Sequence, residues 1–303
     1  MRHIPIHTFQ PSAQWVERAR AATAELLAKA TVAERRDYIN AHGQVWKDLG
    51  AEFRAHFGNK CWYTDAANYG ARLDVEHFRP KLQTVELSAQ DCAEADDNML
   101  LKLPNRVREG YWWLAFDPEN LLLCAQVMNR EEKRNFFPFH SGSPVADSNH
   151  KHVWRNEIPV FLDPRRLDDV CLVTYDERGA MRPRSDVTGW DRLRVVVTNE
   201  CFGLSRFQPL VEGRQQVWQR CAEFIQKYMA AKQREINDGV PTPALAQEKH
   251  EALTALQRML APNEPFCSVV ASCLRNSPYQ WAQALATQPA VQMPQPQAVP
   301  NPN

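Results

Sequence analysis

Apolar residues recur at helical spacing through the first 57 residues of the chain. A helix is predicted after Pro11–Ser12, a start signal, and a second helix over 31–57. Thr31 and Glu34 have the spacing of a capping box, and Gly58–Asn59 provide a helix stop. The pattern therefore predicts an N-terminal helical segment, residues 1–58.

Short apolar runs replace the helical period after residue 58. Residues 60–63, 73–78 and 120–124 are predicted as strands or strand-like arms, and the apolar run 111–116 is predicted as core. Residues 82–110 are polar and irregular, which is typical of a loop. The pattern predicts a small strand-containing module over residues 59–140.

The remainder of the chain is predicted to be mainly helical. Helices are expected over 192–199, 211–231, 244–260 and 264–286, after a short strand pair formed by 158–163 and 170–175. Residues 287–303 are rich in Pro and Gln and carry no charge, so we expect a disordered tail. Together these patterns predict an α+β, mainly helical protein with a helical region over 141–286.

Charge and composition restrict the classes of function. The 303 residues carry 36 Lys and Arg against 36 Asp and Glu, so any nucleic-acid binding must use a local basic surface or a partner's charge. No apolar run is long enough to span a bilayer, and the first residues lack the apolar core of a signal peptide. We therefore expect a cytoplasmic protein without a membrane partner, whose eight cysteines are mostly buried thiols.

Three short motifs follow one another in a suggestive order. Residues 74–81 read DVEHFRPK, residues 119–124 read ENLLLC, and residues 129–133 read NREEK. Phosphodiester hydrolysis needs an activated water and a cation at the phosphate. A neutral histidine can take a proton from water near pH 7, and carboxylate and amide oxygens suit Mg²⁺.

Each candidate residue has an expected role in that chemistry. His77 is the candidate general base, and Asn120 is expected to hold the loop that orients it. Glu76 and Asn129 are the candidate metal ligands, and Asp74 is the alternative ligand if Glu76 points away from the site. Candidate phosphate contacts are Arg79, Lys81 and Lys133. Adjacent side chains diverge on a strand, so Glu76 and His77 would both face the site only at a bend or bulge.

The order of these motifs resembles the HNH nucleases, and among them the nuclease subunits of Septu antiphage systems, which also occur as effectors of some retrons. The resemblance is carried by the motifs above and by Cys61-Trp-Tyr, residues 111–116 and Phe137–Pro138, and more loosely by residues 157–164. It implies a ββα-metal (HNH) module, within a mainly helical chain, that uses one Mg²⁺ or Mn²⁺ ion.

The same resemblance implies partners. These are an ATPase subunit of the ABC or SMC-like type, a nucleic-acid substrate (DNA or tRNA) and, in the retron arrangement, a reverse transcriptase with its RNA and DNA. We expect the helices over 192–286 to bind the ATPase, with burial in the core as the alternative.

The sequence departs from the HNH pattern at two cysteine pairs. Many HNH proteins bind a structural Zn²⁺ through two Cys-x-x-Cys pairs, but here the pairs read Cys61-x-x-Thr64 and Cys124-x-x-Val127. A closed structural site needs four N or S ligands. We therefore expect no tightly bound zinc, with packing by Trp62, Trp112 and Trp113 in its place; a different site completed by Cys92 and His140 is the alternative.

Two other functions remain open. The incomplete cysteine pairs fit an assembly protein that binds an ATPase without catalysis. A stand-alone restriction-type nuclease is the other alternative, although neutral net charge and the lack of a recognisable DNA-reading module count against it.

Overall fold

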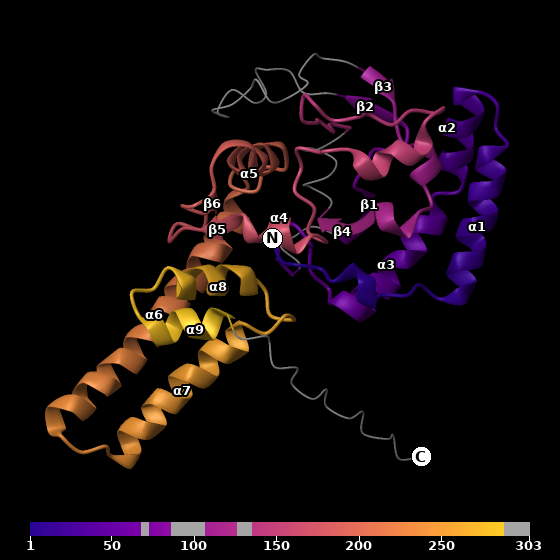
Figure 1. Ribbon diagram of the computed structural model, residues 1–303. Helices are drawn as coiled ribbons and strands as arrows, with labels where there is room; N and C mark the ends of the chain where they lie inside the picture. Colours follow the sequence, from indigo (N-terminus) through magenta and orange to yellow (C-terminus); the bar gives the residue numbers. More distant parts are fainter. Residues whose placement is uncertain (68–72, 86–106, 126–134, 288–303) are drawn as a thin grey trace, which may run out of the picture.

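The computed structural model describes residues 1–67, 73–85, 107–125 and 135–287. Helices dominate this part of the chain, and the strands form small two-stranded antiparallel sheets (Figure 1). The expected α+β class is confirmed. The expected disordered tail lies, apart from Thr287, outside the described residues.

The N-terminal helices begin at the predicted caps. The hydroxyl of Ser12 accepts from the backbone N–H of Trp15 at the start of α1 (Ala13–Leu27). At the start of α2 (Val32–Ala41), Thr31 and Glu34 form a complete capping box.

The single helix predicted over 31–57 is wrong. His42 leaves the helical conformation, with φ −104° and ψ 20°, and α3 (Gln44–Phe57) starts after Gly43, a residue that weakens a helix interior. Gly58, at φ 83°, ends α3 as predicted.

One strand pair contains parts of the first two candidate motifs, and a second pair lies between them in the chain. β1 (Leu73–His77) pairs antiparallel with β4 (Leu121–Ala125), and β2 (Gln83–Val85) pairs with β3 (Val107–Glu109). The short 3₁₀ helices η3 (Trp112–Leu114) and η4 (Pro118–Asn120) precede β4. Residues 60–63 form a turn instead of the expected strand, and the N–H of Trp62 donates to the carbonyl of Leu123 at 3.0 Å.

The strand pairing predicted after residue 157 is also wrong. β5 (Val173–Tyr175) pairs with β6 (Met181–Pro183), not with 158–163. Between them in the chain, Asp176 and Gly179 form a tight turn, in which Gly179 has φ 80°, and so the nearest downstream segment becomes the partner. The helix α4 (Leu167–Cys171) occupies the start of the segment predicted as a strand.

Five helices complete the described chain. They are α5 (Gly189–Cys201), α6 (Gln208–Asp238), α7 (Pro243–Met259), α8 (Cys267–Arg275) and α9 (Gln280–Thr287). The last two replace the single helix expected over 264–286. In the described ranges, no helix combines the length and apolar character needed to cross a bilayer.

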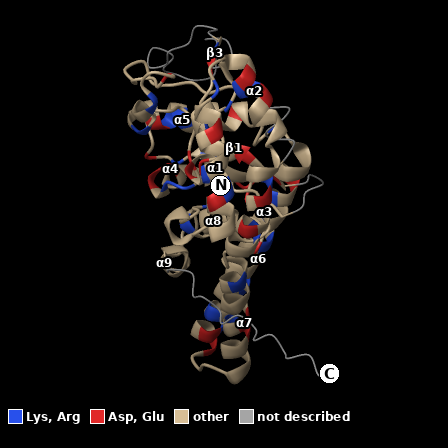
Figure 2. Ribbon diagram, turned by 90° about the vertical axis from the view of Figure 1, so that its right-hand side faces the viewer, with Lys and Arg blue, Asp and Glu red and all other residues tan. Residues whose placement is uncertain are grey.

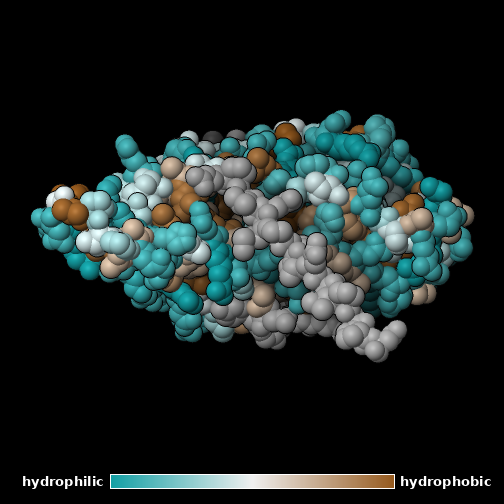
Figure 3. Space-filling view, turned by 90° about the horizontal axis from the view of Figure 1, so that it is seen from below, coloured by the Kyte–Doolittle hydropathy of each residue, from teal (hydrophilic) through white to brown (hydrophobic). Residues whose placement is uncertain are grey.

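α6 and α7 form an antiparallel arm that projects from the body (Figure 1). Ion pairs join the two helices, with Lys249 Nζ 2.6 Å from Glu235 Oε2 and a second pair between Arg234 and Glu248. Both signs of charge therefore lie along the arm (Figure 2). Apolar atoms are visible at the left end of the molecule, where the turn between α6 and α7 lies (Figure 3).

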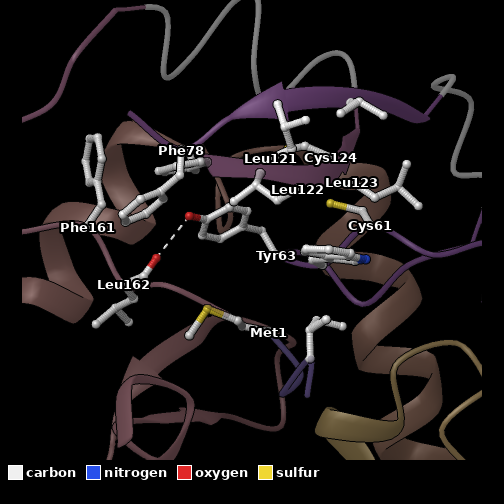
Figure 4. Close-up of a cluster of buried hydrophobic side chains, with 14 of the residues drawn as sticks. Met1, Cys61, Tyr63, Phe78, Leu121, Leu122, Leu123, Cys124, Phe161 and Leu162 are labelled. Carbon is white, nitrogen blue, oxygen red and sulfur yellow. Dashed lines mark hydrogen bonds between the residues drawn. The ribbon is translucent and has the colours of Figure 1, made fainter. Parts of the chain in front are cut away.

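One large hydrophobic core joins the N-terminal helices, the strands and the segment after residue 140. Tyr63, from the turn after α3, lies in it and donates its hydroxyl to the carbonyl of Leu162 at 3.0 Å (Figure 4). A second cluster lies between α6, α7, α8 and α9. The division of the chain at residues 58, 140 and 286 stays a prediction, since the first core crosses both 58 and 140.

Candidate active site

His77 is the last residue of β1 and lies directly opposite Leu121 of β4. Burial alternates along β1, so His77 shares its inner face with Leu73 and Val75. The side chain is only 3% exposed, and the edge of its ring meets Trp46 of α3 with centroids 5.0 Å apart. The helix α3 thus covers the face of the sheet that carries the candidate base.

A backbone carbonyl fixes the orientation of the His77 ring. Nε2 lies 2.9 Å from the carbonyl oxygen of Ala115. A carbonyl can only accept, so Nε2 carries the proton and Nδ1 presents its lone pair. Lys81 Nζ lies 3.4 Å from that Nδ1. In this tautomer, Nδ1 is the atom that can take up a proton.

Asn120 fixes the chain that follows His77. Its Oδ1 accepts from the N–H of Arg79 at 2.8 Å, and its Nδ2 donates to the carbonyls of Arg79 at 3.1 Å and Leu114 at 3.3 Å. The carbonyl of Asn120 also accepts from the N–H of Phe78 at 2.8 Å. A buried amide that is bonded at both ends restrains residues 78 and 79 beside His77.

Glu76 lies on the face of β1 opposite to His77, because the strand pairs in unbroken register from 73 to 77. Its charge still reaches Lys81, which is half-buried and lies 4.9 Å from the centre of the Trp46 ring. Burial lowers the pKa of Lys81, Glu76 opposes that shift, and Lys47 adds to it. The charges of Glu76 and Lys47 therefore both act on Lys81 at the end of β1.

Arg79 is committed to a buried ion pair close to His77 in the sequence. Its guanidinium is buried, with Nε 2.9 Å from Glu157 Oε2 and Nη2 donating to the carbonyl of Trp154 at 3.1 Å. Glu157 also accepts from the hydroxyl of Tyr111 at 2.6 Å. Breaking such a buried pair is costly, so this geometry argues against the expected phosphate contact by Arg79 and leaves that role to Lys81.

Three residues of the sequence prediction lie outside the described ranges: Asn129, Lys133 and Cys92. Within those ranges, no group of three His, Cys, Asp or Glu side chains is arranged to hold a metal ion. Mg²⁺ usually keeps several waters and takes only one or two protein carboxylates. The carboxylate of Glu76 is a suitable hard donor for it, but the unbroken register of β1 places Glu76 on the face opposite to His77. The expected bend that would bring both to one face is absent from β1, and the pairing of Glu76 with Asn129 remains a prediction.

The two incomplete cysteine pairs meet in the core. Cys61 and Cys124 are both buried and share a hydrogen bond, and the N–H of Thr64 donates to Cys61 Sγ at 3.4 Å. Burial raises the pKa of Cys61, but the bonds from Cys124, Thr64 and the backbone outweigh it and lower the pKa to about 6. The ring of His140 lies against Trp190, with its Nδ1 accepting from the N–H of Gly142 at 3.0 Å.

The sequence did not reveal three supporting groups of this site. The carbonyl of Ala115 is a backbone atom, so no residue type announces it. Trp46 lies in a segment predicted to be helical, but that placement says nothing about its contact with His77. Glu157 lies 78 positions from Arg79, and no local pattern links the two.

Comparison with known proteins gives one partial similarity. No family model matches the chain. A stretch of 106 residues is 31% identical to the Septu protein PtuB of Bacillus mycoides (strain KBAB4) and covers 34% of this chain. The match spans 31% of the length of that protein. The chain is thus an α+β protein with a buried histidine and a buried asparagine at the end of a two-stranded sheet, and it resembles PtuB over 106 residues.

Proposed function

We propose that this protein is a metal-dependent HNH endonuclease that acts as the nuclease component of a Septu-type antiphage system. One observation carries the proposal: His77 ends a strand of an antiparallel pair, and Asn120, just before the partner strand, bonds to the backbone that follows His77. The motif order and the partial similarity to PtuB support it.

In this proposal His77 is the general base. The carbonyl of Ala115 holds the proton on Nε2, and Nδ1 accepts from Lys81 Nζ. Nδ1 would therefore accept the proton of the attacking water once Lys81 turns to the phosphate. Asn120 is a positioning residue, because it acts through the backbone of residues 78 and 79. Lys81 provides positive charge beside the phosphate. Because its pKa is lowered, Lys81 loses its proton at a lower pH than an exposed lysine does. The phosphate contact would weaken as the pH rises through that pKa.

A divalent cation, Mg²⁺ or Mn²⁺, would be held by Glu76 and Asn129, with water as its other ligands. When bound, it would neutralise charge on the phosphate during hydrolysis. Lys133 would contact the phosphate as well. We expect no structural Zn²⁺ at Cys61 and Cys124.

The proposed partner is an ATPase subunit of the ABC or SMC-like type, bound through the helices over 192–286. The substrate is DNA or tRNA, and in a retron arrangement a reverse transcriptase with its RNA and DNA would join the complex. The proposed location is the cytoplasm.

The test is a cleavage assay on the full chain with Mg²⁺ or Mn²⁺, supercoiled plasmid and total tRNA, with and without an ATPase subunit of the proposed type and its nucleotide. His77→Ala should abolish cutting. His250→Ala, which removes an exposed histidine of α7, is the matched control and should cut as the native chain does. Equal cutting by His77→Ala would refute the assignment of the base.

A non-catalytic assembly protein is the second candidate. The complete burial of the Cys61 and Cys124 pair, with Thr64 in place of a further thiol, favours it because a module that has lost its zinc ligands can also have lost catalysis. It predicts tight binding to the ATPase and no metal-dependent cutting of either polymer. A stand-alone restriction-type nuclease predicts cutting of plasmid at the same rate without the ATPase.

A further inference from the structure

A basic and aromatic segment lies beside the candidate active site. The segment, residues 150–156 with the sequence HKHVWRN, includes the 3₁₀ helix η6 (Lys151–Asn156). His152 and Arg155 are exposed, and Lys151 is half-buried. Asp147 caps its start by accepting from the N–H of His150 at 2.7 Å. The chain has no net charge, so a local cationic segment is the feature that a polyanion would recognise.

Contacts attach this segment to both parts of the candidate site. The carbonyl of Trp154 accepts from Arg79, two residues after His77, at 3.1 Å. Arg155 Nη2 lies 3.4 Å from the carboxylate of Glu119, the neighbour of Asn120. The segment thus contacts the residues after β1 and the residues before β4, which Asn120 holds together.

Both cations of the segment lie over tryptophan rings. Lys151 Nζ is 4.9 Å from the ring centre of Trp112, in η3, which precedes the carbonyl of Ala115 that orients His77. The guanidinium of Arg155 is 4.4 Å from the ring centre of Trp154. A ring beneath a cation restricts the side chain, so less freedom is lost when that cation binds an anion.

The ion pair of Arg155 is easily exchanged. Its side chain and that of Glu119 are both 63% exposed, and exposed pairs contribute at most about 1 kcal/mol. A phosphate can accept two parallel N–H bonds from a guanidinium. Arg155 can therefore leave Glu119 for a phosphate, in contrast to the buried Arg79.

The spacing of the two cations fits one strand of nucleic acid. Four residues of a 3₁₀ helix rise about 8 Å, so both cations can reach the backbone of the same strand. We propose that Lys151 and Arg155 bind phosphates of the nucleic-acid strand that the candidate site cuts. This inference rests on the proposed function, and the shared ligand chemistry is the phosphodiester backbone of DNA or RNA.

The test is binding, measured separately from cutting. Fluorescence anisotropy with the full chain in EDTA, over a series of salt concentrations, uses three labelled probes: a single-stranded DNA 30-mer, its duplex and tRNA. The variants are Lys151→Ala and Arg155→Ala, with Arg258→Ala as matched control, since it removes an exposed arginine of α7. Glu119→Gln removes the competing carboxylate and should tighten binding.

The expected result is a loss of about tenfold in affinity for each of Lys151→Ala and Arg155→Ala. The slope of the logarithm of the binding constant against the logarithm of the salt concentration should become shallower by about 0.7–0.9 per lost contact. Arg258→Ala should bind as the native chain does. The probe that binds most tightly identifies the polymer.

Unchanged affinity and salt dependence in both alanine variants would overturn this proposal, and so would a native chain that binds none of the probes. Neither result decides whether the protein is a nuclease, because cutting and its loss in His77→Ala are measured independently. Weakened binding without any cutting would support the phosphate contacts and count against the nuclease.

Discussion

The backbone N–H of Phe266 donates to the carbonyl oxygen of Asp65 at 2.8 Å. Within residues 1–67, 73–85, 107–125 and 135–287, these two are the non-glycine residues with positive φ, each at 58°. The conformation costs about 1–3 kcal/mol per residue and persists only where surrounding contacts hold it. Here those contacts join the turn after α3, which adjoins β4, to the start of α8.

The carboxylate of Asp65 provides most of these contacts. It accepts from Lys60 Nζ at 2.7 Å and from the N–H of Ser268 in α8 at 2.9 Å. Both members of the ion pair are buried, with Lys60 1% and Asp65 0% exposed. Asp65 therefore connects the region around the candidate site to the C-terminal helices.

Asp65→Asn should lower the free energy of unfolding by about 3 kcal/mol, because it leaves the buried Lys60 without its counter-charge. Asparagine tolerates positive φ, so the loss reports the charge and not the backbone. Urea denaturation measures it. Asp48→Asn, at the partly exposed pair with Arg18, is the control and should cost less than about 1 kcal/mol. Equal losses in the two variants would contradict this account.

The free energy of unfolding should decrease in acid because Asp65 becomes protonated. Burial raises the pKa of Asp65, but the charges of Lys60 and the N-terminal amine and the bonds from Lys60 and Ser268 outweigh it and lower the pKa below its usual 3.8. A lowered carboxyl pKa stabilises the fold above the unfolded value, and that contribution disappears as pH falls through the folded value. The native chain should therefore lose more stability below about pH 4 than Asp65→Asn does, in denaturation curves at several pH values.

Thr31→Ala should lower the free energy of unfolding by about 1 kcal/mol, because Thr31 and Glu34 form the capping box of α2. Thr188 precedes α5 as its N-cap but makes no side-chain capping bond. Thr188→Ala is thus a matched control, and thermal or urea unfolding should show almost no change. A loss as large as that of Thr31→Ala would contradict the capping explanation.

Asn120→Ala should impair both folding and cutting. It removes three side-chain bonds and leaves the polar backbone groups of Arg79 and Leu114 buried without this partner, at a cost of about 1–3 kcal/mol. Cutting should fall further than the folded fraction, since residues 78 and 79 lose their restraint. Asn40→Ala, at an exposed position of α2, should change stability by less than about 0.5 kcal/mol. Full activity of folded Asn120→Ala would remove Asn120 from the site.

The sequence by itself determined the features that depend on neighbouring residues. Helix starts at Ser12 and Thr31 and the stop at Gly58 follow from local capping and from the freedom of glycine at positive φ. The two-residue alternation of a strand separates Glu76 from His77. The order of the motifs around His77 and Asn120 is likewise a property of the chain alone, and it is enough to indicate the candidate site.

Only the tertiary structure decided which distant groups meet. It paired β5 with β6, buried Arg79 against Glu157, and set the carbonyl of Ala115 beside His77. These contacts depend on how the core packs and on where each buried charge finds its partner, and a one-dimensional pattern carries neither. For the same reason, the left-handed conformation of Phe266 is invisible in the sequence: the bond to Asp65, 201 positions earlier, holds it in place.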